Sequence, residues 1–161
     1  AADRHDVVMR ELILMRHAEA EPVGTAANDF ARKLTTQGVQ SATDAAQRLL
    51  RLYGTPDFIL HSPAIRTIET AATVSSTLRL ATSLMQADPR LYLATPETIL
   101  ERIAAAPDTA ERLLVIAHNP TVSELAALLP NDGSHAEFMA TAEFRHFSLD
   151  IASWRELHSR L

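Results

Sequence analysis

The sequence predicts an α/β fold, a three-layer sandwich in which helices flank a mostly parallel central sheet. Three observations indicate this fold. Short apolar runs that suit buried strands recur along the chain, and stretches of helical periodicity lie between them. Two of the runs are followed directly by Ser62-Pro63 and Asn119-Pro120, and a capping residue before proline is typical of a helix start. Strands and helices that alternate in this way favour parallel strand pairing.

Each strand is predicted from an apolar run, and each helix from an apolar stripe or from its start and stop residues. The expected strands span residues 11–17, 57–61, 83–87, 112–118 and 142–151. The expected helices span residues 36–53, 63–79, 96–106, 120–129 and 153–160. An irregular loop is expected over residues 18–34, and a turn over 130–133.

The helix over residues 36–53 has the clearest boundary signals. Thr35 or Thr36 suits its N-cap, and Gly54 fits its end, with Pro56 directly beyond. Its predicted buried stripe consists of Val39, Ala42, Ala46, Leu49, Leu50 and Tyr53.

The composition fits one globular domain over residues 1–161. The apolar content of 47% is ordinary for such a domain, and Met9 is a candidate natural start that leaves residues 1–8 as a flexible extension. The net charge of −5 and the pI near 5.8 argue against nucleic acid or an anionic membrane as partner. An anionic substrate is still compatible with this charge, because a few arginines in one cleft reverse the local field.

Several classes of protein are excluded or disfavoured by what the sequence lacks. It contains no cysteine, which excludes a disulfide framework, a thiolate zinc site and a cysteine nucleophile. No signal peptide is visible at the N-terminus, and no apolar run approaches the ~20 residues that a membrane-spanning helix needs. We therefore expect a cytoplasmic protein, and the sequence does not indicate its oligomeric state.

Basic and nucleophilic side chains follow three of the predicted strands at the point where each strand ends. Arg16 and His17 end the first strand, Ser62 and Arg66 come just after the second, and His118 ends the fourth. Ligands of open α/β sheets bind outside the carboxyl ends of the strands. We therefore expect two arginines and two histidines to meet at one edge of the sheet.

These residue types suit a phosphoryl group. The guanidinium fork of arginine matches phosphate oxygens, and histidine is a nucleophile when neutral and a donor when protonated. Phosphoryl transfer needs mainly positioning and stabilisation of charge on the equatorial oxygens. A histidine in line with the leaving group can take the phosphoryl group covalently, after which water releases phosphate.

Four segments of the chain resemble motifs of one known family. Residues 14–19, with Arg16-His17, resemble the Arg-His-Gly signature of the histidine phosphatase superfamily, the phosphoglycerate mutase-like group. Residues 62–70 resemble its Ser-Pro-x-x-Arg-x-x-x-Thr motif, and residues 117–120 its Gly-His-Asn motif. Residues 29–38 resemble the Asp-x-x-Arg-x-Leu-Thr-x-x-Gly stretch of the small SixA-like phosphohistidine phosphatase branch. The motifs occur in the family's order and at its spacing.

The resemblance implies roles for the four side chains. His17 would be the phosphorylated nucleophile, and Arg16, Arg66 and His118 would be catalytic phosphate ligands. It also implies that the enzyme needs no metal or other cofactor and lacks the large lid insertion of longer members. The seven histidines give no independent sign of a metal site, since none has the H-x-x-x-H spacing of a zinc site.

One departure from the family bears on the substrate. Larger members carry a glutamate general acid after the third strand, where this chain has Tyr92. An alkoxide leaving group needs a proton from a placed acid, whereas imidazole leaves as a neutral ring. The sequence therefore favours phosphohistidine on a protein as substrate. Asp88, Glu97 or Glu19 remain candidate proton donors, and Ala18 and Ala117 are small replacements for family glycines.

Two other functions are compatible with the same residues. The same site would suit a small-molecule phosphomonoesterase or mutase, with a small phosphate ester as substrate, or a non-catalytic phosphate-binding or phospho-relay module. Outside the four core residues, Ser62 and Asn119 are interpreted chiefly as N-caps, with contact to phosphate as an alternative for Ser62. Arg32 is interpreted as an exposed residue, with contact to substrate as the alternative. Glu69 is expected either to support the arginines or to lie on the helix surface, and His61 either to support the site or simply to pack.

Overall fold

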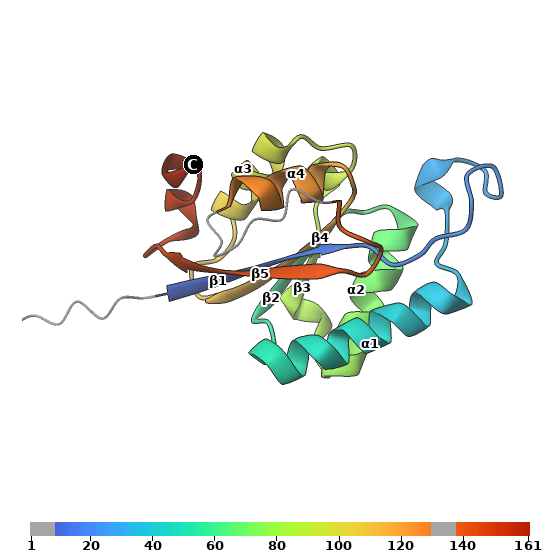
Figure 1. Cartoon of the computed structure of the whole chain (residues 1–161), viewed down its shortest axis with the longest axis horizontal. Coiled ribbons are helices and arrows are strands. Elements are labelled where there is room, and N and C mark those ends of the chain that lie inside the picture. Colours follow the sequence, from blue (N-terminus) through green and yellow to red (C-terminus); the bar gives the residue numbers. More distant parts are fainter. Residues whose placement is uncertain (1–8, 130–137) are drawn as a thin grey trace, which may run out of the picture.

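The computed structural model describes residues 9–129 and 138–161, and within these ranges it contains one five-stranded sheet in the order β3-β2-β4-β1-β5. The strands are β1 (Met9–Arg16), β2 (Phe58–His61), β3 (Met85–Ala87), β4 (Arg112–Ala117) and β5 (Phe144–Asp150). The helices are α1 (Thr36–Tyr53), α2 (Ile65–Leu78), α3 (Pro96–Ala104) and α4 (Thr121–Leu128). The sheet lies between α1 and α2 on one side and α3 and α4 on the other, which confirms the predicted three-layer α/β sandwich (Figure 1).

The strand pairing confirms a mostly parallel sheet. β4 pairs in parallel with both β1 and β2, and β2 pairs in parallel with β3. β5 is antiparallel to β1 and forms one edge. The carboxyl ends of β1, β2 and β4 therefore lie at the same edge of the sheet.

Strand residues alternate between two apolar clusters, one on each face of the sheet. Leu12 and Leu14 of β1 pack in the cluster on the side of α3 and α4, while Ile13 and Met15 pack in the cluster on the side of α1 and α2. All four side chains are almost fully buried. This two-sided burial explains why the central strands read as unbroken apolar runs.

Helix α1 has the predicted boundaries, but its buried face is narrower than predicted. Thr35 is the N-cap, and its hydroxyl accepts from the Gly38 amide. Val39 and Leu50 were predicted to face the core but are 42% and 48% exposed. Each lies about 100° around the helix from a buried neighbour, so both fall outside the core face. The buried residues of α1 are Gly38, Ala42, Ala45, Ala46 and Leu49.

The predicted N-caps of α2 and α4 were wrong. Within the described residues, α2 begins at Ile65 and α4 at Thr121, and neither start has a side-chain cap. Ser62 and Asn119 lie before these helices, where their side chains hydrogen-bond to groups from other segments. Ser62 and Asn119 therefore form hydrogen bonds with distant parts of the chain and do not cap the helices.

The remaining differences concern chain ends and loops. The predicted helix over 153–160 consists of two short 3₁₀ turns, η4 (Trp154–Glu156) and η5 (His158–Arg160). Further 3₁₀ turns are η1 (Asp29–Ala31), η2 (Thr82–Leu84) and η3 (Pro89–Leu91). The extension over 1–8 and the turn over 130–133 fall outside the described residues. No helix in the described part of the chain has the length and apolar character needed to cross a membrane.

Candidate active site

The structure brings the four predicted site residues together at the carboxyl edge of the sheet. Arg16 ends β1, His17 follows it, His118 follows β4, and Arg66 lies in the first turn of α2. The His17 amide donates to the Ala117 carbonyl at 3.2 Å, which joins the ends of β1 and β4. The imidazole rings of His17 and His118 lie with centroids 5.4 Å apart and with their planes tilted by 57°.

The loop after His17 is held against α2 and the start of α1. The Ala18 amide donates to the Thr70 hydroxyl at 3.0 Å, and this hydroxyl donates to the Arg66 carbonyl at 2.7 Å. Gly38 allows the start of α1 to approach the same loop, because a Cβ there would lie 2.1 Å from the Glu19 carbonyl oxygen. These contacts fix the backbone on both sides of the site.

The hydrogen bond of His17 determines which ring nitrogen is free. Its Nδ1 lies 2.7 Å from the Ala18 carbonyl oxygen, which can only accept, so Nδ1 carries the proton and Nε2 has the lone pair. Burial lowers the pKa of His17 to about 4, and the positive charges of Arg66 and Arg16 act in the same direction. At pH 7 the ring is therefore neutral, with Nε2 able to act as a nucleophile.

His118 is also neutral at pH 7. Burial lowers its pKa to about 3, and the charge of Arg66 adds to this effect. Its Nε2 lies 2.7 Å from the Ser62 hydroxyl, which also accepts from the Ala64 amide at 3.2 Å. A serine hydroxyl that donates its proton to Nε2 leaves the ring proton on Nδ1. Ser62, which was expected to cap α2, therefore contacts a predicted site residue directly.

A network around Asp29 holds Arg66. The Arg66 guanidinium donates to the Asp29 carbonyl at 2.8 Å and to its Oδ2 at 3.1 Å. Arg32 donates to Oδ1 through Nε and Nη2, and the Tyr92 hydroxyl donates to Oδ2 at 2.8 Å. The Tyr92 hydroxyl, followed by Arg32 and Arg66, lowers the pKa of Asp29 to about 2. The carboxylate is therefore ionised at neutral pH.

Arg16 is held by the segment that leads into β5. Its guanidinium donates to the Met139 carbonyl at 3.1 Å, and the Asn119 side-chain amide donates to the same carbonyl at 2.9 Å. The Ala142 amide donates to the carbonyls of both Arg16 and His17. Asn119, predicted as a helix cap, instead positions the carbonyl that holds Arg16.

Three buried nitrogen atoms of the site have no partner. Among the side chains of residues 9–129 and 138–161, the buried polar atoms without a hydrogen bond are Arg16 Nε, Arg66 Nε and His118 Nδ1. Buried donors normally have partners, because a lost hydrogen bond in the interior costs about 1–3 kcal/mol. All three belong to the four residues singled out from the sequence. Together they form a set of donors suited to an anion.

A cavity of about 440 Å³ is lined by two of the four predicted site residues, Arg66 and His118, whereas Arg16 and His17 are not part of its lining. Its lining includes Asp29, Arg32, Arg66, Leu93, His118 and Asn119. Of the two interpretations of Arg32, the structure favours contact with the site over surface exposure, because its side chain is only 16% exposed and helps to line this cavity. The arginine pair gives the cavity a positive side, while Asp29 places one negative charge beside it.

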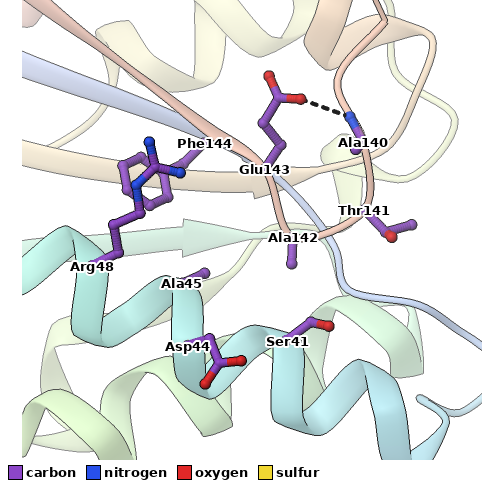
Figure 2. Close-up of a pocket in the computed structure, with 9 residues that line it drawn as sticks. All are labelled: Ser41, Asp44, Ala45, Arg48, Ala140, Thr141, Ala142, Glu143 and Phe144. Atoms are coloured by element: carbon purple, nitrogen blue, oxygen red, sulfur yellow. Dashed lines mark hydrogen bonds between the residues drawn. The ribbon is translucent and has the colours of Figure 1, made fainter.

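A second pocket lies between α1 and the Ala140–Phe144 segment, as Figure 2 shows. Its volume is about 330 Å³, and Arg48 lies over the Phe144 ring at 5.6 Å. None of the four predicted site residues lines it. Its wall contains Asp44 and Glu143 as well as Arg48, so it lacks the cationic character of the first cavity.

None of the three candidate proton donors, Asp88, Glu97 and Glu19, is part of the cavity lining. Asp88 is buried, caps the Arg90 amide and is paired with Arg102. Glu97 is an exposed partner of His158, and Glu19 accepts from the Thr35 hydroxyl. The pairing of Asp88 and the exposure of Glu97 leave neither group arranged to deliver a proton at the site.

Glu69 and His61, the two other residues considered from the sequence, each hydrogen-bond to a backbone group. Glu69 accepts from the Leu34 amide at 2.9 Å, a contact with the segment before α1 that neither expectation included. His61 is buried, with its Nδ1 2.9 Å from the Ser62 carbonyl oxygen. Among the described residues, no cluster of three or more His, Asp or Glu side chains could hold a metal ion.

Sequence reasoning did not assign roles to Asp29 and Tyr92. Asp29 was noticed only as part of a resemblance, and Tyr92 only as the replacement of an acid. A local signal existed for Asp29, because an aspartate three residues before Arg32 can pair with it within one turn. The contact with Tyr92 spans 63 positions, and no spacing rule predicts it.

Known proteins resemble this chain in sequence and in structure. The sequence model of the histidine phosphatase superfamily (branch 1) matches residues 12–92. The uncharacterized protein Rv1276c of Mycobacterium tuberculosis is 36% identical over 118 residues, which cover 71% of this chain and 69% of the relative. The uncharacterized protein ML1117 of Mycobacterium leprae is 30% identical over 126 residues, covering 75% and 74% of the two chains.

Two solved structures extend the comparison to nearly the whole chain. A protein assigned as phosphohistidine phosphatase SixA in Nakamurella multipartitia has a TM-score of 0.76 and 31% identity, covering 92% of this chain and 89% of its own. The protein histidine phosphatase SixA complexed with tungstate has a TM-score of 0.75 and 28% identity, covering 87% and 88%.

Proposed function

The chain belongs to the histidine phosphatase superfamily, and we propose that it hydrolyses phosphohistidine on a protein through a covalent intermediate on His17. The observation that carries this proposal is the set of three unpartnered buried donors, Arg16 Nε, Arg66 Nε and His118 Nδ1. A tetrahedral oxyanion supplies acceptors to all three at once. The similarity to a SixA structure complexed with tungstate, itself a tetrahedral oxyanion, supports the same interpretation.

In the first step the lone pair of His17 Nε2 attacks phosphorus, and the bond between phosphorus and the leaving group breaks. The Nδ1–H bond to the Ala18 carbonyl orients the ring and stabilises the positive charge that develops on it. Arg16, Arg66 and His118 hold the equatorial oxygens, whose charge they stabilise. In the second step water attacks the phosphohistidine, which returns His17 to its neutral state and releases phosphate.

The state of the acidic residues near the site indicates which kind of leaving group the enzyme can release. Asp29 is ionised at neutral pH, and Asp88 is already paired with Arg102. An alkoxide would need a proton from a placed acid, and general acid catalysis contributes about 10² to 10⁴ in rate. An imidazole that is protonated on its second nitrogen leaves as a neutral ring without such help. This difference supports phosphohistidine over an alkyl phosphate.

A comparison of substrates tests the proposal. The purified protein is expected to hydrolyse a phosphohistidine-containing protein with a kcat/KM at least about 100-fold higher than for glucose 6-phosphate or AMP, as the lower range of general acid catalysis suggests. Phosphate release is measured for each substrate at pH 7. A preference for the esters would support a phosphomonoesterase instead. A phosphorylated His17 that accumulates without releasing phosphate would support a phospho-relay module.

A further inference from the structure

We propose that Tyr92 determines leaving-group specificity, because its hydroxyl oxygen accepts a hydrogen bond from an N–H group of the leaving imidazole. The inference rests on the proposed phosphatase function and adds a residue that selects N-phosphorylated over O-phosphorylated substrates.

Contacts on several sides fix the position of Tyr92. Its ring packs edge-on against His118, with centroids 5.7 Å apart, and against Phe30, with centroids 5.1 Å apart. Its hydroxyl donates to Asp29 Oδ2 at 2.8 Å. Tyr92 is not part of the lining of the cavity of about 440 Å³, but it contacts two residues that are, Asp29 and His118. A leaving group that enters the cavity beside Asp29 and His118 would come within reach of this hydroxyl.

The direction of the Tyr92 proton follows from its partner. Asp29 is surrounded by donors from Arg32, Arg66 and Tyr92, and an ionised carboxylate can only accept. The bond to Asp29 raises the pKa of Tyr92, so the phenol keeps its proton. That single proton points to Asp29, so the lone pairs of the oxygen can act only as acceptors toward a bound group. Tyr92 is thereby held as an acceptor and not as a proton donor.

A hydrogen-bond acceptor at Tyr92 would stabilise a leaving imidazole, which carries an N–H group. In a phosphohistidine protonated on its second ring nitrogen, attack by His17 breaks the P–N bond, and the bonding pair returns to the ring nitrogen. The second nitrogen keeps its proton, and the product is a neutral imidazole. The unprotonated ring would instead have to leave as an anion. A hydrogen bond from this N–H to Tyr92 stabilises the protonated ring, whereas the oxygen of a phosphate ester offers no N–H.

Tyr92→Phe tests the inference because it removes the acceptor and keeps the ring. The substrates are Nε2-phosphorylated N-acetylhistidine and para-nitrophenyl phosphate, whose leaving group needs no proton and has no N–H. The ratio of the two kcat/KM values, phosphohistidine over ester, is expected to fall about tenfold, as for one hydrogen bond to a charged group. The upper limb of the kcat–pH profile for phosphohistidine should move about one pH unit lower.

The matched control is Tyr53→Phe. Tyr53 stacks on His146, with centroids 3.8 Å apart, and neither residue lines the cavity. Its ratio and pH profile should equal those of the wild type. If Tyr92→Phe lowers both activities by the same factor, or neither, Tyr92 has only a structural role and the inference is overturned. Wild-type protein that hydrolyses neither substrate would contradict the proposed function itself, which is a separate outcome.

Discussion

Replacing His17 by asparagine is expected to reduce kcat by at least about a thousandfold, because the attacking nitrogen is lost. The asparagine amide can still donate to the Ala18 carbonyl, which Nδ1 reaches at 2.7 Å in the wild type. The variant therefore removes Nε2 while it preserves the local hydrogen bond. His17→Ala should be equally inactive and folded. Single-turnover assays with phosphohistidine measure the loss, and circular dichroism checks the fold.

His61→Asn is the matched control for this substitution. His61 is buried at the end of β2, and its Nδ1 contacts the carbonyl of the next residue in the same way as that of His17. This variant should retain most of the wild-type rate. Turnover by His17→Asn near the wild-type rate would exclude His17 as the nucleophile, whatever the behaviour of the control.

The pH profile of the wild-type enzyme should show the protonation of His17 Nε2. Because burial lowers the pKa of His17 to about 4, Nε2 keeps its lone pair from pH 7 down to that region. Below it the ring gains a proton and cannot attack phosphorus. We therefore expect kcat/KM to have an acidic limb near pH 4, well below the ordinary histidine pKa of about 6.5.

Replacing Arg66 by alanine is expected to weaken tungstate binding about 100-fold and to lower kcat/KM by about 10² to 10³. Arg66 offers a buried, unpartnered Nε to the anion, and its other nitrogens are anchored on Asp29. Its loss removes a phosphate ligand and also leaves the Asp29 carboxylate with less compensating charge. Isothermal titration calorimetry with tungstate measures the affinity directly.

Two further variants separate the possible reasons for this loss. Arg66→Lys keeps the charge but lacks the planar fork, so it should restore only part of the affinity. Arg90→Ala removes an exposed arginine paired with Glu101, and tungstate binding should be unchanged. An Arg66→Ala variant with wild-type affinity would place Arg66 outside the anion site.

The sheet and the four central residues could be predicted from the sequence because both depend on local patterns. Apolar runs locate the strands, and parallel strands must end at a common edge, so Arg16, His17 and His118 follow from their positions after β1 and β4. Helix α1 was predicted with correct bounds because Thr35 and Gly54 are strong local signals.

Residues that act through distant partners could not be predicted in this way. Ser62 and Asn119 have the chemistry of N-caps, but their partners, His118 and the Met139 carbonyl, come from other parts of the chain. Tyr92 meets Asp29 only after η3 and η1 are brought to the same cavity. Such contacts depend on tertiary packing, which overrides local preference.

A crystal structure of the protein soaked with tungstate tests the central claim most directly. We predict one anion whose oxygens lie within hydrogen-bond distance of Arg16 Nε, Arg66 Nε and His118 Nδ1, with His17 Nε2 facing the tungsten atom. An anion bound only elsewhere, for example beside Arg48 in the pocket of Figure 2, with those three nitrogens still unpartnered, would contradict the claim.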